Sequence, residues 1–149
     1  MRRSSVADAL SVALLESVDS SASCERVGVD AVHIPTWERH LQVGGEALLR
    51  RTYTPDEIEF CAGRVDRLAT RLAGKEAVLK VLGTGIRGIG LRDVEVHSMS
   101  SGRPTIIVHG PAQRALKHAG LNRVEISLCH EQQYALAVAI GVAGGGRDE

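Results

Sequence analysis

The fold class is decided by residues 124–140, VEISLCHEQQYALAVAI. Two apolar runs flank the polar residues 131–133, and this pattern predicts a strand, a turn and a second strand. A second hairpin is predicted further back, because residues 94–97 alternate apolar and polar, a turn at 100–104 follows, and 105–109 reads TIIVH. Two-residue to five-residue turns join antiparallel strands, so the sequence favours an α+β fold with an antiparallel sheet.

The longest predicted helix covers residues 65–82. Leucines recur through it at helical spacing, no proline interrupts it, and Gly83 stands where a stop is expected. These leucines are Leu68, Leu72, Leu79 and Leu82.

Three shorter helices and one more strand complete the pattern. Residues 36–49 predict a helix that is broken or ended near Gly44-Gly45. The sequence TPDE at 54–57 is a capping box that starts a helix running to about residue 63, and Pro111 opens one that ends at Gly120. The apolar residues 26–34, RVGVDAVHI, predict a buried strand.

The composition indicates a globular protein without a nucleic-acid or membrane role. The chain has 149 residues, 44% of them hydrophobic, which suffices for a core without a disulfide or metal. Its 18 Lys and Arg balance 18 Asp and Glu, and 3% of residues are aromatic, so neither nucleic acid nor a base-stacking platform is expected. No apolar run approaches the roughly 20 residues that span a bilayer. The three cysteines lack zinc-ligand spacing and fit reduced thiols in a cytoplasm.

We expect one domain over residues 26–143. Residues 1–25 contain two arginines and an apolar stretch, but Asp8 interrupts that stretch early and no clear cleavage site follows. They are therefore interpreted as a flexible leader rather than an export signal. The glycine-rich residues 144–149 are expected to form a disordered tail.

Asp30 is the first candidate functional residue, because it interrupts the apolar strand at 26–34. Burying a lone carboxylate is costly unless a cation or hydrogen bonds compensate for it. The neighbouring residues supply no such partner, so a cation must come from elsewhere in the fold or from solution. A divalent metal such as Mg²⁺, which prefers carboxylate oxygens, is one solution. A strand-end aspartate that caps a turn or pairs with an arginine is the other.

The helix segment 71–80, RLAGKEAVLK, carries the second candidate group. Lys75 and Lys80 are two of only three lysines in the chain, and Glu76 and Lys80 stand four residues apart on one helix face. The simplest interpretation is a surface ion pair worth roughly a few tenths of a kcal/mol. The adjoining residues 83–85, GTG, favour a binding role, because bare backbone can approach a phosphate there. The segment is not a P-loop, since the spacing of that motif is absent.

Residues 127–130, SLCH, bring a serine, a cysteine and a histidine to the end of a predicted strand. Residues adjacent in sequence rarely form the spatial triad that nucleophilic catalysis requires, so a nucleophilic Cys129 is the less favoured interpretation. His130 is able to donate to a phosphate, and an ordinary turn residue is the alternative.

These candidates belong to a longer series of motifs. In chain order they are GVD at 28–30, YTPDE at 53–57, RLAGKEAVLK at 71–80, GTG at 83–85, DVEV at 93–96, GRP at 102–104, SLCH at 127–130 and YA at 134–135. With this series the chain resembles, from about Gly28 to Gly141, the holo-acyl-carrier-protein synthases. These are the short, single-domain group of phosphopantetheinyl transferases.

The resemblance implies the phosphopantetheinyl transferase fold and an activity. Members transfer the phosphopantetheine arm of coenzyme A to a serine of an acyl carrier protein and leave adenosine bisphosphate, with Mg²⁺ on the pyrophosphate. Asp30 and Glu76 are then the metal ligands, and Lys80 stabilises charge on the leaving bisphosphate. The base for the carrier serine is left open between a metal-bound water and a carboxylate such as Glu76. The further implied contacts to coenzyme A are Arg71, Lys75, Gly83, Gly85, Arg103, Pro104 and His130.

The resemblance also implies protein partners. Members form trimers with active sites between subunits, so His130 and Arg103 are expected to act across an interface. Carrier proteins are acidic, and basic residues on the first helix are candidates to steer them, with a solvated charged face as the alternative. These candidates are Arg39, His40, Arg50 and Arg51.

Two departures from the family pattern accompany the resemblance. Residues 35–37, PTW, stand where a basic residue is common, which bears on carrier docking, and Cys129 stands where serine is usual. The pathway is left open between fatty acid and polyketide assembly, and the metal between Mg²⁺ and Mn²⁺. Two alternative functions are a non-catalytic coenzyme-A-binding or oligomerisation module of the same fold, and another Mg²⁺-dependent phosphoryl or nucleotidyl transferase.

Overall fold

The computed structural model describes residues 23–83 and 88–144. It confirms the predicted α+β fold with antiparallel strands. The elements in chain order are β1 (Ser23–His33), α2 (Ile34–Thr52), α3 (Pro55–Cys61), α4 (Val65–Leu82), the short 3₁₀ helix η1 (Leu91–Asp93), β2 (Val94–Ser98), β3 (Pro104–Val108), α5 (Gly110–His118), β4 (Arg123–Glu131) and β5 (Tyr134–Ala143). The predicted leader up to residue 22 and the predicted tail from residue 145 lie outside the described residues.

The strands form two antiparallel groups. β5 lies in the middle of a three-stranded sheet of order β1-β5-β4, and β2 pairs with β3 in a separate hairpin. Both hairpins predicted from the sequence are therefore present. β1 begins at Ser23 rather than at Arg26, because its antiparallel pairing with β5 continues past the apolar run. The prediction that this strand is buried is wrong, because β1 is an edge strand on which Val27 and Val29 are 52% and 45% exposed.

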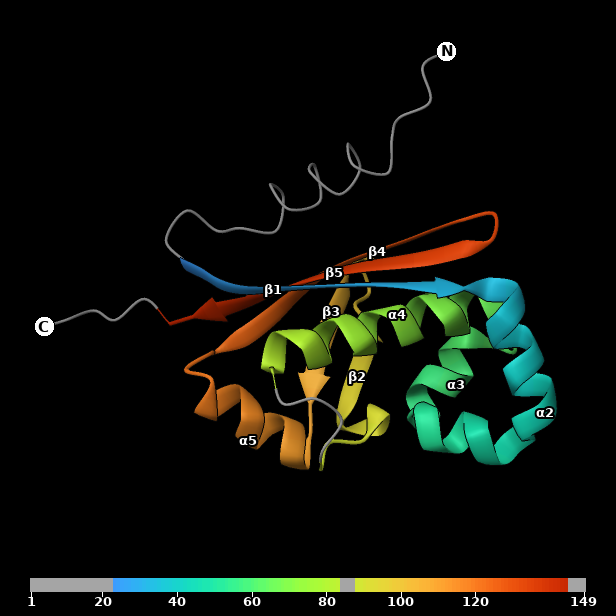
Figure 1. Ribbon diagram of the computed structural model, residues 1–149, viewed down its shortest axis with the longest axis horizontal. Helices are drawn as coiled ribbons and strands as arrows, with labels where there is room; N and C mark the ends of the chain where they lie inside the picture. Colours follow the sequence, from blue (N-terminus) through green and yellow to red (C-terminus); the bar gives the residue numbers. More distant parts are fainter. Residues whose placement is uncertain (1–22, 84–87, 145–149) are drawn as a thin grey trace, which may run out of the picture.

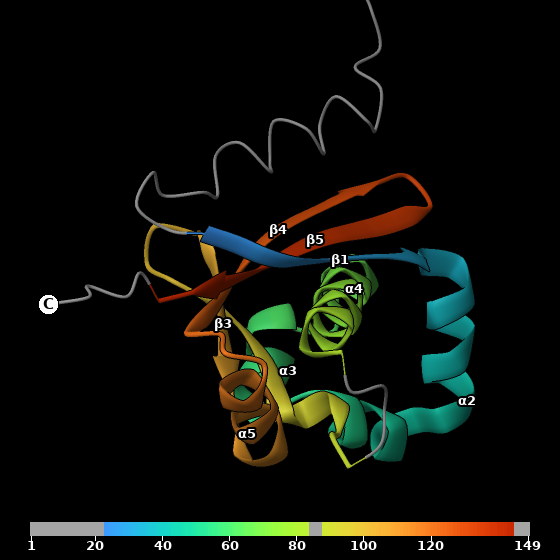
Figure 2. The same cartoon turned by 60° about the vertical axis from the view of Figure 1, so that its left-hand side comes forward.

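Helix α4 lies at the centre of the molecule, as Figures 1 and 2 show. The three-stranded sheet covers one side of it, and β2, α2, α3 and α5 pack on its other sides. Because it is enclosed in this way, α4 is buried around most of its circumference. None of the described helices is long and apolar enough to cross a membrane.

The local helix signals act as predicted, with small shifts. Helix α2 begins at Ile34, because Pro35 is compatible with a first helical turn, and it kinks at Gly45, whose φ is 54°. Thr54 and Glu57 form the predicted capping box: the Glu57 amide donates to Thr54 Oγ1 at 3.3 Å, and the Thr54 amide donates to Glu57 Oε2 at 2.9 Å. The chain therefore turns sharply from α2 into α3 beside α4.

Gly28 allows β1 to approach α4 closely. A Cβ atom at this position would clash with the carbonyl oxygen of Ala77 and would lie 3.1 Å from Val81 Cγ2. The clash involves helix backbone, which a side-chain rotation cannot relieve. The glycine is therefore required for the crossing that places Asp30, two residues later on the same strand face, against α4.

We expect Gly28→Ala to lower the free energy of unfolding by about 1–3 kcal/mol, because the added methyl group must push β1 away from α4. Urea denaturation followed by circular dichroism measures the change. Gly90→Ala is the matched control, since its Cβ would lie 3.5 Å from Asp93 Oδ2, an ordinary contact. Equal stability of the two variants would contradict the close approach of β1 to α4.

Candidate active site

Asp30 finds its cationic partner on α4. The Lys80 ammonium donates to Asp30 Oδ1 at 3.0 Å and to the carbonyl oxygen of Val29 at 2.6 Å. Asp30 is mostly buried, with a side chain 20% exposed, whereas the Lys80 side chain is 54% exposed. Of the two sources left open by the sequence, the fold and the solution, the fold supplies a cation: a lysine 50 residues further along the chain.

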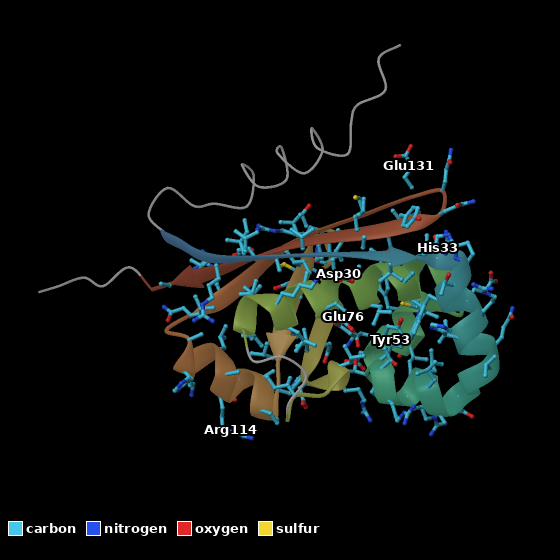
Figure 3. The ribbon with its side chains drawn as sticks, viewed as in Figure 1. Asp30, His33, Tyr53, Glu76, Arg114 and Glu131 are labelled. Atoms are coloured by element: carbon cyan, nitrogen blue, oxygen red, sulfur yellow. The ribbon has the colours of Figure 1, made fainter. Side chains whose placement is uncertain are left out.

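Glu76 joins this pair from the helix side. It lies one turn before Lys80 on α4, and Figure 3 shows Asp30 and Glu76 together where β1 crosses this helix. Burial raises the pKa of the Glu76 carboxyl above its ordinary value, the negative charge of Asp30 raises it further, and Lys80 lowers it. Two ionised carboxylates beside one ammonium leave the site with a net negative charge. The site therefore favours the binding of a further cation.

The donor set fits a magnesium ion that is shared with a phosphate ligand. Among the described residues, no group of three or more His, Cys, Asp or Glu side chains is arranged to hold a metal. Mg²⁺ is commonly held by one or two carboxylates, with substrate phosphates and waters as its remaining ligands. Asp30 and Glu76 match that pattern, and Lys80 beside them is a donor for the same phosphates.

Lys75 is fully buried, in contrast to its neighbour Glu76. Its ammonium donates to Glu57 Oε2 at 2.6 Å and to the carbonyl oxygens of Leu91 and Val94 at 3.1 and 2.6 Å. These three bonds use all the hydrogens of the ammonium. Lys75 is therefore satisfied inside the protein, and we do not retain it among the proposed phosphate contacts.

Arg71 is also buried, on the side of α4 that faces α3 and β2. It donates to Ser98 Oγ at 2.8 Å, and its Cζ atom lies 4.0 Å from the centre of the Phe60 ring. Its Nε atom is buried without a hydrogen-bond partner. These contacts hold Arg71 at a cavity of about 330 Å³ between α3 and β2, away from the strand that carries Asp30.

The remaining predicted contacts lie at other ends of the fold. Gly83 ends α4 in a left-handed conformation, with φ of 72°, and Gly85 lies outside the described residues. Arg103 precedes Pro104, the first residue of β3, and donates to Glu125 at 3.2 Å. His130 Nε2, near the tip of the β4–β5 hairpin, lies 3.7 Å from Asp66 Oδ2. The described part of the chain thus brings Asp30, Glu76 and Lys80 together but not the other predicted contacts.

The strand order explains why His130 lies far from Asp30. Asp30 is opposite Ala137 of β5, and Ala137 is opposite Leu128 of β4. His130 is therefore two strands away from Asp30 and two residues closer to the hairpin turn. In Figure 3, Glu131, the next residue, projects from the far end of this hairpin.

Comparison with known proteins places the chain in a family. Residues 26–139 match the model of the 4'-phosphopantetheinyl transferase superfamily. The chain belongs to this superfamily. The family, the enzyme class and the fold that the motifs predicted are confirmed.

Curated relatives and solved structures agree with the family model. The chain is 44% identical over 116 residues to the holo-[acyl-carrier-protein] synthase of Gloeobacter violaceus, which covers 75% of this chain and 88% of the relative. The synthase structure from Neisseria meningitidis has a TM-score of 0.72 and 33% identity, over 80% of this chain and 98% of that one. An ACPS–CoA complex from Chronobacterium ammoniagenes has a TM-score of 0.67 and 27% identity, over 79% and 96%.

Proposed function

We propose that this transferase moves the 4'-phosphopantetheine group of coenzyme A to a serine of an apo acyl carrier protein. The new bond joins the serine oxygen to the phosphorus of the pantetheine phosphate. The serine hydroxyl gives its proton to a base, for which the Glu76 carboxylate is one candidate. The bond between that phosphorus and the bridging pyrophosphate oxygen breaks, and adenosine 3',5'-bisphosphate leaves with the electron pair. The names of the relatives support this reaction, and the Asp30–Glu76–Lys80 cluster is the observation that carries it.

Asp30 and Glu76 would hold the Mg²⁺ ion of this reaction. When bound, the ion neutralises negative charge on the pyrophosphate oxygens. The two carboxylates come from different elements, β1 and α4, so the crossing of the strand over the helix sets their separation. Glu76 is half-buried and lies where a cation relieves its repulsion from Asp30.

Lys80 would stabilise the leaving bisphosphate. Its side chain is half-exposed, and its contact with Asp30 is a single hydrogen bond of 3.0 Å. The ammonium is therefore able to exchange this bond for a phosphate oxygen at little cost, because exposed ion pairs are weak. A positioned ammonium at the atom where negative charge develops lowers the barrier of phosphoryl transfer.

The partner surfaces in this proposal are α2 and a subunit interface. Arg39, His40, Arg50 and Arg51 are exposed on α2 and would steer an acidic carrier protein. Arg103 and His130 are exposed as well, and in a homotrimer they would reach the coenzyme A of a neighbouring subunit. We place the reaction in the cytoplasm, in fatty acid or polyketide assembly.

The presence of all three charged residues at one crossing favours an enzyme over a silent binding module. A module that only bound coenzyme A or formed oligomers would need neither the repelling carboxylates nor the lysine beside them. A different Mg²⁺-dependent phosphoryl or nucleotidyl transferase would share this cluster, but the family of the chain argues for pantetheine transfer.

Intact-mass spectrometry of apo acyl carrier proteins tests the proposal. After incubation with the chain, coenzyme A and Mg²⁺, we expect the carrier to gain one phosphopantetheinyl group, and a chelator should prevent the gain. If coenzyme A binds but no carrier from a panel of fatty acid and polyketide systems gains mass, the binding module is the better account.

Cys129 is not expected to take part in the reaction. Burial raises the pKa of its thiol, and the charge of Glu131 raises it further, so the thiolate is disfavoured at neutral pH. We therefore expect Cys129→Ser to transfer phosphopantetheine at the wild-type rate and iodoacetamide to modify the wild-type thiol slowly. An inactive Cys129→Ser variant with an unchanged melting temperature would assign the thiol a catalytic role.

A further inference from the structure

A buried ion pair joins α3 to α4 at the residue that precedes Glu76. Glu57 of α3 and Lys75 of α4 are 1% and 0% exposed, and their charged atoms are 2.6 Å apart. Glu57 also accepts hydrogen bonds from the amides of Thr54 and Val96, each at 2.9 Å, and Lys75 donates to the carbonyl oxygens of Leu91 and Val94. The pair is fully hydrogen-bonded, as buried charges must be.

The pair links α4 to the edge of β2 that does not pair with β3. In the described part of the chain β2 pairs only with β3, so its other edge has no neighbouring strand. Val96 N–H and Val94 C=O bond the side chains of Glu57 and Lys75 along that edge. The two side chains thus bond backbone groups that a neighbouring strand would otherwise bond. These bonds fix the position of α4 relative to α3 and β2.

The same contacts set the rotation of α4 about its axis. Consecutive residues of an α-helix point about 100° apart, so a Lys75 held toward β2 fixes the direction of Glu76. On the opposite side, Gly28 brings β1 against Ala77. The helix is therefore held from two sides at the residues next to Glu76.

We infer that Glu57 and Lys75 are positioning residues for the candidate active site: by fixing the rotation of α4, they aim the Glu76 carboxylate at the cation site it shares with Asp30. This inference rests on the proposed function. Stability alone does not account for the pair, because well-packed apolar residues commonly replace a buried ion pair without loss of stability.

Two double variants test the inference, because each removes the pair without leaving an unpaired buried charge. They are Glu57→Gln/Lys75→Met and Glu57→Leu/Lys75→Met. Leu116→Ala, a core truncation in α5, is the matched control for general destabilisation. Three properties are measured for each: the melting temperature, the affinity for Mn²⁺ in the presence of coenzyme A by electron paramagnetic resonance, and kcat and KM for the carrier protein.

We expect at least one double variant to fold, with Mn²⁺ affinity and kcat lowered about tenfold to a hundredfold and KM for the carrier unchanged. Leu116→Ala should lower the melting temperature and leave Mn²⁺ affinity unchanged. The inference is overturned if a folded double variant binds Mn²⁺ as the wild type does, or if neither double variant folds. If the wild-type chain binds Mn²⁺ but modifies no carrier, the proposed reaction is wrong. The Mn²⁺ affinities of the double variants then still test the positioning role. If the wild-type chain binds no Mn²⁺, both the proposed function and the positioning inference are wrong.

Discussion

Glu76→Ala should lower the rate of phosphopantetheine transfer about a thousandfold or more, a loss of about 4 kcal/mol of transition-state stabilisation. The substitution removes one of the two carboxylates that would hold the metal, and Asp30→Ala should have an effect of the same size. Initial rates at saturating coenzyme A and Mg²⁺ measure the loss. Glu59→Ala is the matched control, because this glutamate is exposed on α3 outside the cluster.

Stability and metal affinity distinguish this loss from unfolding. Glu76 is half-buried and repelled by Asp30, so its removal is not expected to lower the melting temperature. Mn²⁺ affinity should fall together with the rate. Chelation of the wild-type protein should reproduce the loss, and added Mg²⁺ should restore the activity. If Glu76→Ala transfers phosphopantetheine at the wild-type rate, the proposed metal site takes no part in the reaction.

Lys80→Met is expected to lower kcat about a hundredfold to a thousandfold, because it removes the donor that meets the charge on the leaving bisphosphate. Its hydrogen bond to Asp30 is partly exposed, and exposed pairs contribute little to stability, so the melting temperature should change little. Single-turnover kinetics with the carrier protein separate this chemical step from binding.

The pattern of effects for Lys80 differs from that for Glu76. Mn²⁺ affinity should not fall in Lys80→Met, because the lysine competes with a cation for Asp30 rather than holding it. Lys80→Arg keeps the charge but not the compact shape of an ammonium, and it should recover only part of the rate. A Lys80→Met variant that binds the metal more weakly and keeps its kcat would contradict the assigned role.

Local sequence signals predicted most of the secondary structure. The capping box at Thr54, the break at Gly45 and the helix 65–82 depend on residues close together in the chain, and all three are present. The two hairpins were predictable for the same reason. Asp30 stood out because a carboxylate in an apolar strand requires a partner, and this requirement correctly pointed to a distant cation.

The buried ion pair of Lys75 with Glu57 was not predicted, although the sequence contains a signal for it. Lys75 lies between Leu72 and Leu79 at spacings of three and four residues, on the apolar stripe of α4. A lysine on such a stripe is buried, and a buried lysine requires a carboxylate. Glu57 was assigned only to the capping box, which uses one of its bonds. Its contacts to Lys75 and Val96 join elements distant in sequence, and only the folded structure reveals them.

The positions of Arg71, Arg103 and His130 depended on packing in the same way. A motif gives their order along the chain but not the face on which each one lies. Arg71 contacts Ser98 and Phe60 because it lies on the face of α4 that packs against α3 and β2, and His130 lies apart from Asp30 because β5 separates β4 from β1. Contacts of Arg103 and His130 with coenzyme A would therefore have to be made across the subunit interface of the proposed homotrimer.

The most direct test of the central claim is the location of Mn²⁺ in crystals grown with coenzyme A. Anomalous scattering should show a peak in bonding contact with the carboxylates of both Asp30 and Glu76, with the pyrophosphate on the same ion and the Lys80 ammonium beside it. A peak elsewhere, or coenzyme A bound with its pyrophosphate away from these three residues, would contradict the account.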